Sequence, residues 1–267
     1  MNEPADMHWI EPYKGFRLQN ATIVVEAAEQ MRELELCGID PAIFADAVDP
    51  AAFISLAIQA GVRNGISANG TVNMVQHLVQ HRPVRLGEEL AVSGHITAVD
   101  EVPRGRIATS ETWFSGKDGE RAITTGRRSL RPKPVQAATR GAGDQPSPVI
   151  EDAGKLRRVR EVMLIAQKVE RYGGRHNPIH YDPEAAKRGG FRAPIIGGGM
   201  GVRYLTAEIW RQFLPQVIDL DIYFRRPIFW DDSFCVLVDS ENDAWKAICL
   251  AKGDKVATEA RINRIGN

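Results

Sequence analysis

The sequence predicts an α+β protein built from two similar halves, and three observations support this prediction. The stretch His81–Val92 aligns without a gap to Arg225–Val236. Each has an Arg-Pro pair at its second and third positions, followed by a short acidic turn and a strand of alternating apolar and polar residues. Further along, Asp118–Pro132 corresponds to Gly253–Ile265. Between the two regions, residues 131–148 are rich in Pro, Ala and Gly and have no hydrophobic period, which is typical of a linker. We interpret the chain as a duplication.

Each half is expected to open with a helix, continue through an Asp-Pro or Asn-Pro turn, and then form a longer apolar helix. The expected helices are Glu26–Cys37, Asp49–Val62 (or the segment just after it), Val162–Tyr172 and Met200–Trp210. The turns also echo each other, because Gly38–Phe44 stands where the second half has Arg175–Tyr181.

Strands are expected after the long helix of each half, where apolar and polar residues alternate. The expected strands are Leu90–Val99, Arg106–Phe114, Ala122–Leu130, Val217–Phe224, Ser233–Asp239, Trp245–Ala251 and Val256–Ile262. Helices and strands that follow one another in this way indicate the α+β class.

The composition is typical of a globular protein without a membrane or nucleic-acid partner. The 34 basic and 34 acidic residues cancel, so no global field attracts a polyanion. No apolar run approaches the roughly 20 residues that span a bilayer, and the first 13 residues lack the apolar core of a signal peptide. Cys37, Cys235 and Cys249 lack metal-site spacing and are expected to be reduced and buried. We expect a cytoplasmic protein without metal or cofactor.

The segment from Tyr172 to Met200 carries most of the functional information. Asn177 tolerates the backbone of a tight turn, and Pro178 fixes the bend that presents His180. Asp182, followed by Pro183, has the pattern of a helix N-cap. On composition alone, a turn histidine bonded to backbone is favoured over a catalytic one at His180.

Three consecutive glycines, Gly197, Gly198 and Gly199, stand just before the apolar helix that is expected to begin at Met200. Glycines at a helix start let a ligand approach backbone N–H groups at the positive end of the helix dipole. The same pattern also suits close packing of a buried helix.

The segment resembles the signature of the MaoC-like, or (R)-specific enoyl-CoA hydratase, family of hot-dog proteins. That signature reads Asp, any residue, Asn-Pro, an aliphatic residue, His, any residue and an acidic residue; Ala, Gly-Phe and Pro-aliphatic-aliphatic-His-Gly follow. The matching positions are Asn177, Pro178, Ile179, His180, Asp182, Ala186, Gly190, Phe191, Pro194, Ile195, Ile196 and Gly198. Arg175 replaces the signature's catalytic Asp, and Gly197 replaces its second His.

The resemblance implies a double hot-dog, in which each half wraps an antiparallel sheet around a central helix. Residues 1–132 would form an N-terminal hot-dog without the motif, since Ile43 stands at the position of His180. Residues 133–148 would be the linker, and residues 149–267 the C-terminal hot-dog that carries the motif.

The resemblance also implies hydration of an enoyl thioester, or the reverse dehydration, as in fatty acid metabolism. His180 would be the base, with His176 as a substitute on the same turn. The thioester would contact Asn177, the three glycines and Arg175, which cannot itself act as a base because a guanidinium stays protonated. Arg175 would bind a substrate anion or fill the vacated site with a salt bridge.

Three functions remain open: an acyl-thioester hydratase or dehydratase, a silent thioester-binding protein or partner of a heteromeric dehydratase, and a thioesterase. The expected partner is a small acyl thioester of CoA or acyl carrier protein, and the sequence leaves open whether two double hot-dogs pair as a homodimer. Arg82, Arg85 and Arg226 are candidates for contact with CoA phosphates.

Overall fold

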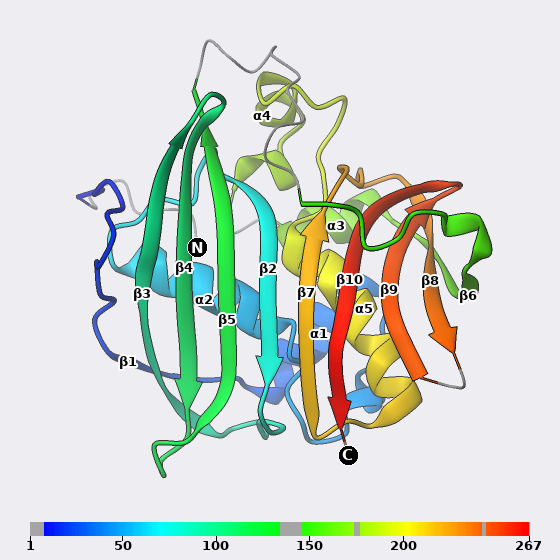
Figure 1. Ribbon diagram of the computed structural model, residues 1–267, viewed down its shortest axis with the longest axis horizontal. Helices are drawn as coiled ribbons and strands as arrows, with labels where there is room; N and C mark the ends of the chain where they lie inside the picture. The colour runs from blue at the N-terminus through cyan, green and yellow to red at the C-terminus, as the bar shows by residue number, and fades with distance from the viewer. Residues whose placement is uncertain (1–7, 134–145, 174–176, 242–243, 267) are drawn as a thin grey trace.

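The computed structural model describes residues 8–133, 146–173, 177–241 and 244–266. Its centre is one ten-stranded antiparallel sheet in the order β1-β3-β4-β5-β2-β7-β10-β9-β8-β6 (Figure 1). The strands are β1 (Ala21–Val24), β2 (Val72–Gln80), β3 (Glu89–Val102), β4 (Gly105–Ser115), β5 (Arg121–Pro132), β6 (Arg157–Met163), β7 (Val217–Phe224), β8 (Ser233–Glu241), β9 (Ala244–Lys252) and β10 (Lys255–Gly266). Strands β1–β5 lie on one side of the junction between β2 and β7, and strands β6–β10 lie on the other.

The register of β2 against β7 fits the duplication. Extending the gapless alignment of residue 81 with residue 225 brings residue 77 onto residue 221, and His77 and Asp221 face each other across the two strands. Two equivalent residues that pair with each other mark an approximate two-fold axis. The sheets of the two halves therefore join edge to edge as one sheet.

The helices lie on one face of this sheet (Figure 1). They are α1 (Ala27–Cys37), α2 (Ala52–Arg63), α3 (Ala166–Gly173), α4 (Pro183–Arg188) and α5 (Gly198–Phe213), with short 3-10 turns η1 (Pro41–Phe44), η2 (Ala153–Lys155) and η3 (Pro178–His180). The long helices α2 and α5 are the central helices of the two halves. This arrangement confirms the predicted α+β class and the double hot-dog architecture.

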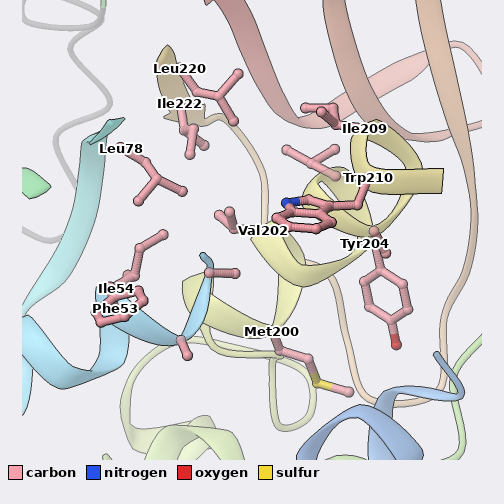
Figure 2. Close-up of a cluster of buried hydrophobic side chains, with 14 of the residues drawn as sticks. Phe53, Ile54, Leu78, Met200, Val202, Tyr204, Ile209, Trp210, Leu220 and Ile222 are labelled. Carbon is pink, nitrogen blue, oxygen red and sulfur yellow. The ribbon is translucent and has the colours of Figure 1, made fainter. Parts of the chain in front are cut away.

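The core fills the space between α2, α5 and the two central strands. Figure 2 shows Phe53 of α2, Leu78 of β2, Trp210 of α5 and Leu220 of β7 pointing into one cluster. Helix α5 is buried on all sides from Met200 to Trp210. Because a fully buried helix has no contact with water, each of its polar side chains needs a hydrogen-bond partner inside the protein.

Arg203, near the middle of α5, finds its acidic partners in the first half of the chain. Its guanidinium donates to Asp49 at 2.7 Å and to Glu33, and its Nε donates to the Tyr172 hydroxyl at 2.9 Å. Thr206 donates to the other oxygen of Asp49 at 2.8 Å. Arg203 is 1% exposed and Asp49 is fully buried, so this network ties the two halves together inside the core.

The predicted elements differ from the structure in two places. The helix expected over Val162–Tyr172 is wrong in its first part, because Arg157–Met163 forms edge strand β6 beside β8 and α3 begins only at Ala166. Strands β1 and β2 were not predicted. In β2 the polar residues Gln76 and Gln80 occupy buried positions, which hides the alternation.

The end of the predicted linker is anchored to the second half. Arg225 donates to the carbonyl oxygens of Pro146 and Ser147, and Glu259 accepts the N–H groups of Val149 and Ile150. Residues 134–145 lie outside the described residues. In the described part of the chain, no helix is both long and apolar enough to cross a bilayer.

Candidate active site

A cavity of about 530 Å³ lies where the start of α5 meets α2 and β2 of the first half. Five of the residues singled out by the sequence line it: Asn177, His180, Gly197, Gly198 and Gly199. Arg175 and His176, the two other candidates, lie outside the described residues. The motif of the second half therefore opens onto a cavity that the first half helps to build.

A tight 3-10 turn presents His180 to the cavity. The side chain of Asn177 accepts the N–H of Ile179, and Pro178 occupies the first position of the turn. The first half contains the same turn, in which Asp40 accepts the N–H of Ala42, but there Ile43 stands in place of the histidine. The two turns thus share their backbone geometry, but only the turn of the second half carries a histidine that can act as a base.

The hydrogen bond of His180 to the backbone fixes its tautomer. Nδ1 lies 2.9 Å from the carbonyl oxygen of Ile195, which can only accept, so Nδ1 carries the proton. In the neutral ring, Nε2 then holds a lone pair. Burial lowers the pKa of His180 below its usual value of 6.5, because the charged ring is poorly solvated there. His180 is consequently a neutral base at neutral pH.

Nε2 of His180 lies beside the start of α5. A Cβ built on Gly197 would lie 3.8 Å from Nε2. Helix α5 begins at Gly198 without a side-chain cap, and its first backbone bond within the helix runs from the Gly201 N–H to the Gly197 oxygen. The N–H groups of the first turn therefore point out of the helix and add to the positive end of its dipole. A developing negative charge at this point is stabilised.

Both halves of the chain enclose this helix start. Near Gly198 lie the ring of Phe224 and the amide nitrogen of Asn73, and near Gly199 lies the Ser55 hydroxyl, with Tyr172 slightly further away. Sequence reasoning missed Asn73 and Ser55. Both sit on elements of the first half, and neither belongs to a motif that would have marked it.

Replacing Gly198 by valine is expected to abolish thioester binding. Even the first added carbon would lie 3.0 Å from the Phe224 ring and 3.2 Å from the Asn73 amide, so the branched side chain must occupy the cavity. We expect at least a tenfold loss of affinity for a CoA thioester in calorimetric titration, about the effect of 1.4 kcal/mol.

Gly201→Ala is the matched control on the same helix. An added Cβ there meets its neighbours at 3.6 Å or more, and alanine is the better helix former. Affinity is expected to stay within about twofold of the unmodified protein. Equal affinity of the Gly198→Val variant would show that the ligand binds elsewhere.

The cavity also has exposed basic residues along its outer part. Arg63, Arg104 and Arg226 line it and are exposed to solvent. The two other arginines proposed for phosphate contact do not line the cavity; Arg82 pairs with Glu88, and Arg85 pairs with Asp46. Of Arg82, Arg85 and Arg226, Arg226 alone is among the cavity's lining residues.

No family model matches the chain. A 3-hydroxyacyl-thioester dehydratase X of Mycobacterium tuberculosis is 27% identical over 195 residues, which is 70% of this chain and 66% of that protein. The chain thus matches slightly less than two thirds of that relative's length.

Three solved structures show the likeness in three dimensions. The crystal structure of HtdX from Mycobacterium tuberculosis has a TM-score of 0.75 at 20% identity and covers 93% of this chain and 99% of that one. A MaoC-like dehydratase from Phytophthora capsici has a TM-score of 0.67 at 15% identity, with 92% and 95% covered. A conserved hypothetical protein of Mycobacterium tuberculosis, described as having a double hot-dog fold, has a TM-score of 0.59 at 13% identity, with 91% and 94% covered. The chain has the double hot-dog fold of these proteins.

Proposed function

We propose that the protein is a MaoC-like enzyme that hydrates an enoyl thioester or dehydrates a 3-hydroxyacyl thioester. The observation that carries this proposal is the unprotonated Nε2 of His180, which lies beside the uncapped start of α5 inside the cavity. The names of the similar proteins, a 3-hydroxyacyl-thioester dehydratase and a MaoC-like dehydratase, support it.

The arrangement suits addition of water across a double bond. With the thioester oxygen at the first N–H groups of α5, electron density moves toward that oxygen as a water oxygen bonds to the β-carbon. His180 Nε2 takes the proton from the water and then gives it to the α-carbon, so one water is added and the histidine returns to its neutral form. A single base can thus perform both proton transfers, which is consistent with Arg175 in place of the signature's Asp.

The carrier of the acyl group is proposed to be CoA or acyl carrier protein. Arg63, Arg104 and Arg226 line the outer cavity, where they meet solvent. Arginine binds phosphate oxygens through paired N–H groups, and both carriers hold their thioester on a phosphate-bearing arm. The exposed arginines would then hold the phosphates while the acyl group enters toward His180.

The direct test is loss of the ultraviolet absorbance of a conjugated enoyl thioester, such as crotonyl-CoA, when protein is added. Hydration removes the conjugation and releases no thiol. Release of free thiol would instead indicate a thioesterase. Binding without either change, for every enoyl thioester tried, would contradict the hydratase and favour the silent thioester-binding protein, for which Arg175 in place of the Asp is the sequence evidence.

The pKa of His180 makes a pH prediction. Because burial lowers it below 6.5, the base form persists below that pH, and kcat/KM is expected to be constant through the neutral range. The acidic limb should lie below pH 6.5 and should be missing from the residual rate of the His180→Gln variant. Below pH 6.5 the unfolded chain binds a proton at this histidine that the folded one resists, so stability should fall there too. An acidic limb centred above 6.5 would contradict this assignment.

A further inference from the structure

Arg127, on β5 of the first half, is a cation without an acidic partner inside the cavity. Its Nε donates to the Asn73 side-chain oxygen at 2.6 Å, and its terminal nitrogen donates to the Thr71 hydroxyl at 3.1 Å. Both partners are neutral, and no carboxylate of the described residues forms an ion pair with Arg127. Burial without an opposing charge lowers its pKa to about 10.

Other arginines on this face of the sheet do have acidic partners. Arg106 and Arg131 also border the same region, and each has a carboxylate partner in Glu11. Arg127 is left with N–H groups beyond the two that Asn73 and Thr71 accept, since a guanidinium has five. The partner that would suit the remaining N–H groups of Arg127 is an anion.

A second, smaller cavity of about 60 Å³ continues from the first at Arg127. The two cavities share Arg127 and Thr71 among their lining residues. The hydroxyl residues that line the smaller one are Ser67, Thr71, Ser110, Thr112, Thr125 and Ser129. Apolar side chains such as Leu18, Ile58 and Ile66 line this chamber as well, so it is the cation at its entrance that favours a polar group there.

Arg127 lies close to the position of the thioester. The Asn73 amide nitrogen is 3.2 Å from where a Cβ of Gly198 would be, and the oxygen of the same amide accepts from Arg127. One amide group therefore separates the guanidinium from the start of α5. A phosphate of CoA lies at the far end of the long pantetheine arm, which leads away from the thioester, so the anion near Arg127 must belong to the acyl group.

We infer that the acyl group of the substrate carries a carboxylate a few carbons from the thioester, and that Arg127 binds it. This inference rests on the proposed function and names its substrate class: the monothioester of a short dicarboxylic acid. Asn73 and Thr71 hold the guanidinium in place, and its remaining N–H groups bind the carboxylate oxygens.

The test compares glutaryl-CoA with pentanoyl-CoA, which differ only by a carboxylate in place of the terminal methyl group. Neither is unsaturated, so calorimetric titration of the unmodified protein measures binding alone. We expect glutaryl-CoA to bind about tenfold to a hundredfold more tightly, the range for a charge-assisted hydrogen bond. Arg127→Met should remove this preference and leave pentanoyl-CoA affinity unchanged or higher.

Arg128→Met is the matched control, because Arg128 is the next residue on the same strand and its side chain points to the opposite face of the sheet. It should keep the full preference for glutaryl-CoA. Circular dichroism of both variants checks their folding. If Arg127→Met does not fold, Arg127→Lys, which keeps the charge but loses the paired geometry, should show an intermediate preference.

The pantetheine thioesters of the same two acids separate the two sources of an anion. If Arg127 binds the acyl carboxylate, the preference for the glutaryl group persists without the nucleotide. If it binds a phosphate, Arg127→Met weakens both CoA thioesters equally, and the inference is wrong. Equal binding of the two acyl groups by the unmodified protein would also overturn it. Turnover of crotonyl-CoA in that case would leave the proposed function standing.

Discussion

Replacing His180 by alanine is expected to lower kcat/KM for hydration of an enoyl thioester by about 100- to 10,000-fold, the usual range for general acid–base catalysis. The ring is held by the Ile195 carbonyl with its free nitrogen beside the start of α5, so its removal leaves no described base at that point. The measurement is the rate of absorbance loss of the conjugated thioester. Affinity for a saturated CoA thioester should change little, because the glycines that receive the thioester remain.

His176→Ala is the informative companion to this variant. Sequence reasoning leaves His176 as a substitute base on the same turn, and the residue lies outside the described part of the chain. If His180 is the base, His176→Ala should keep most of the activity. The reverse result, with His180→Ala active and His176→Ala inactive, would move the catalytic role to His176.

Replacing Arg203 by methionine is expected to lower the free energy of unfolding by about 3–5 kcal/mol. Methionine fills much of the volume, but Asp49, which is fully buried, and Glu33 would lose their cation. The melting temperature should fall by roughly 10 °C for a chain of this size. Urea denaturation followed by circular dichroism measures the change.

Two controls separate a broken buried pair from a general loss of charge. Lys246→Met removes a cation from an exposed ion pair with Glu241, and such pairs contribute little, so no measurable change is expected. Adding Asp49→Asn to Arg203→Met should recover part of the loss, because a neutral amide is cheaper to bury alone than a carboxylate. A double variant less stable than Arg203→Met alone would contradict this account.

Local sequence patterns predicted most of the fold because most elements have a regular hydrophobic period. Strand β7 matches its predicted range, and α5 extends the predicted helix by two residues at its start and three at its end. The failures occurred where tertiary contacts override local pattern. Arg157–Met163 forms a strand because the edge of β8 offers it hydrogen-bond partners, and β2 carries polar residues at its buried positions because they lie at the join between the halves.

The candidate site was predictable in one half only. His180 and Gly198 belong to a contiguous motif, so their neighbourhood can be read along the chain. Asn73 and Arg127 reach the same cavity from two strands of the other half, and they are brought together by pairing between β2 and β5. No sequence pattern within either strand predicts that these residues belong to the site, because their position in the cavity depends on which strands pair.

The buried carboxylate of Asp49 determines how many ligands the chain should hold. The Asp49 carboxylate accepts the N–H of Ala51 just before α2, at the position where the second half has Gly197–Gly199. It also accepts hydrogen bonds from Arg203 and Thr206. The protein's own side chain thus acts as a permanent internal ligand at one of the two helix starts. Although the architecture repeats, titration should therefore saturate at one thioester per chain, so a duplicated fold provides a single binding site.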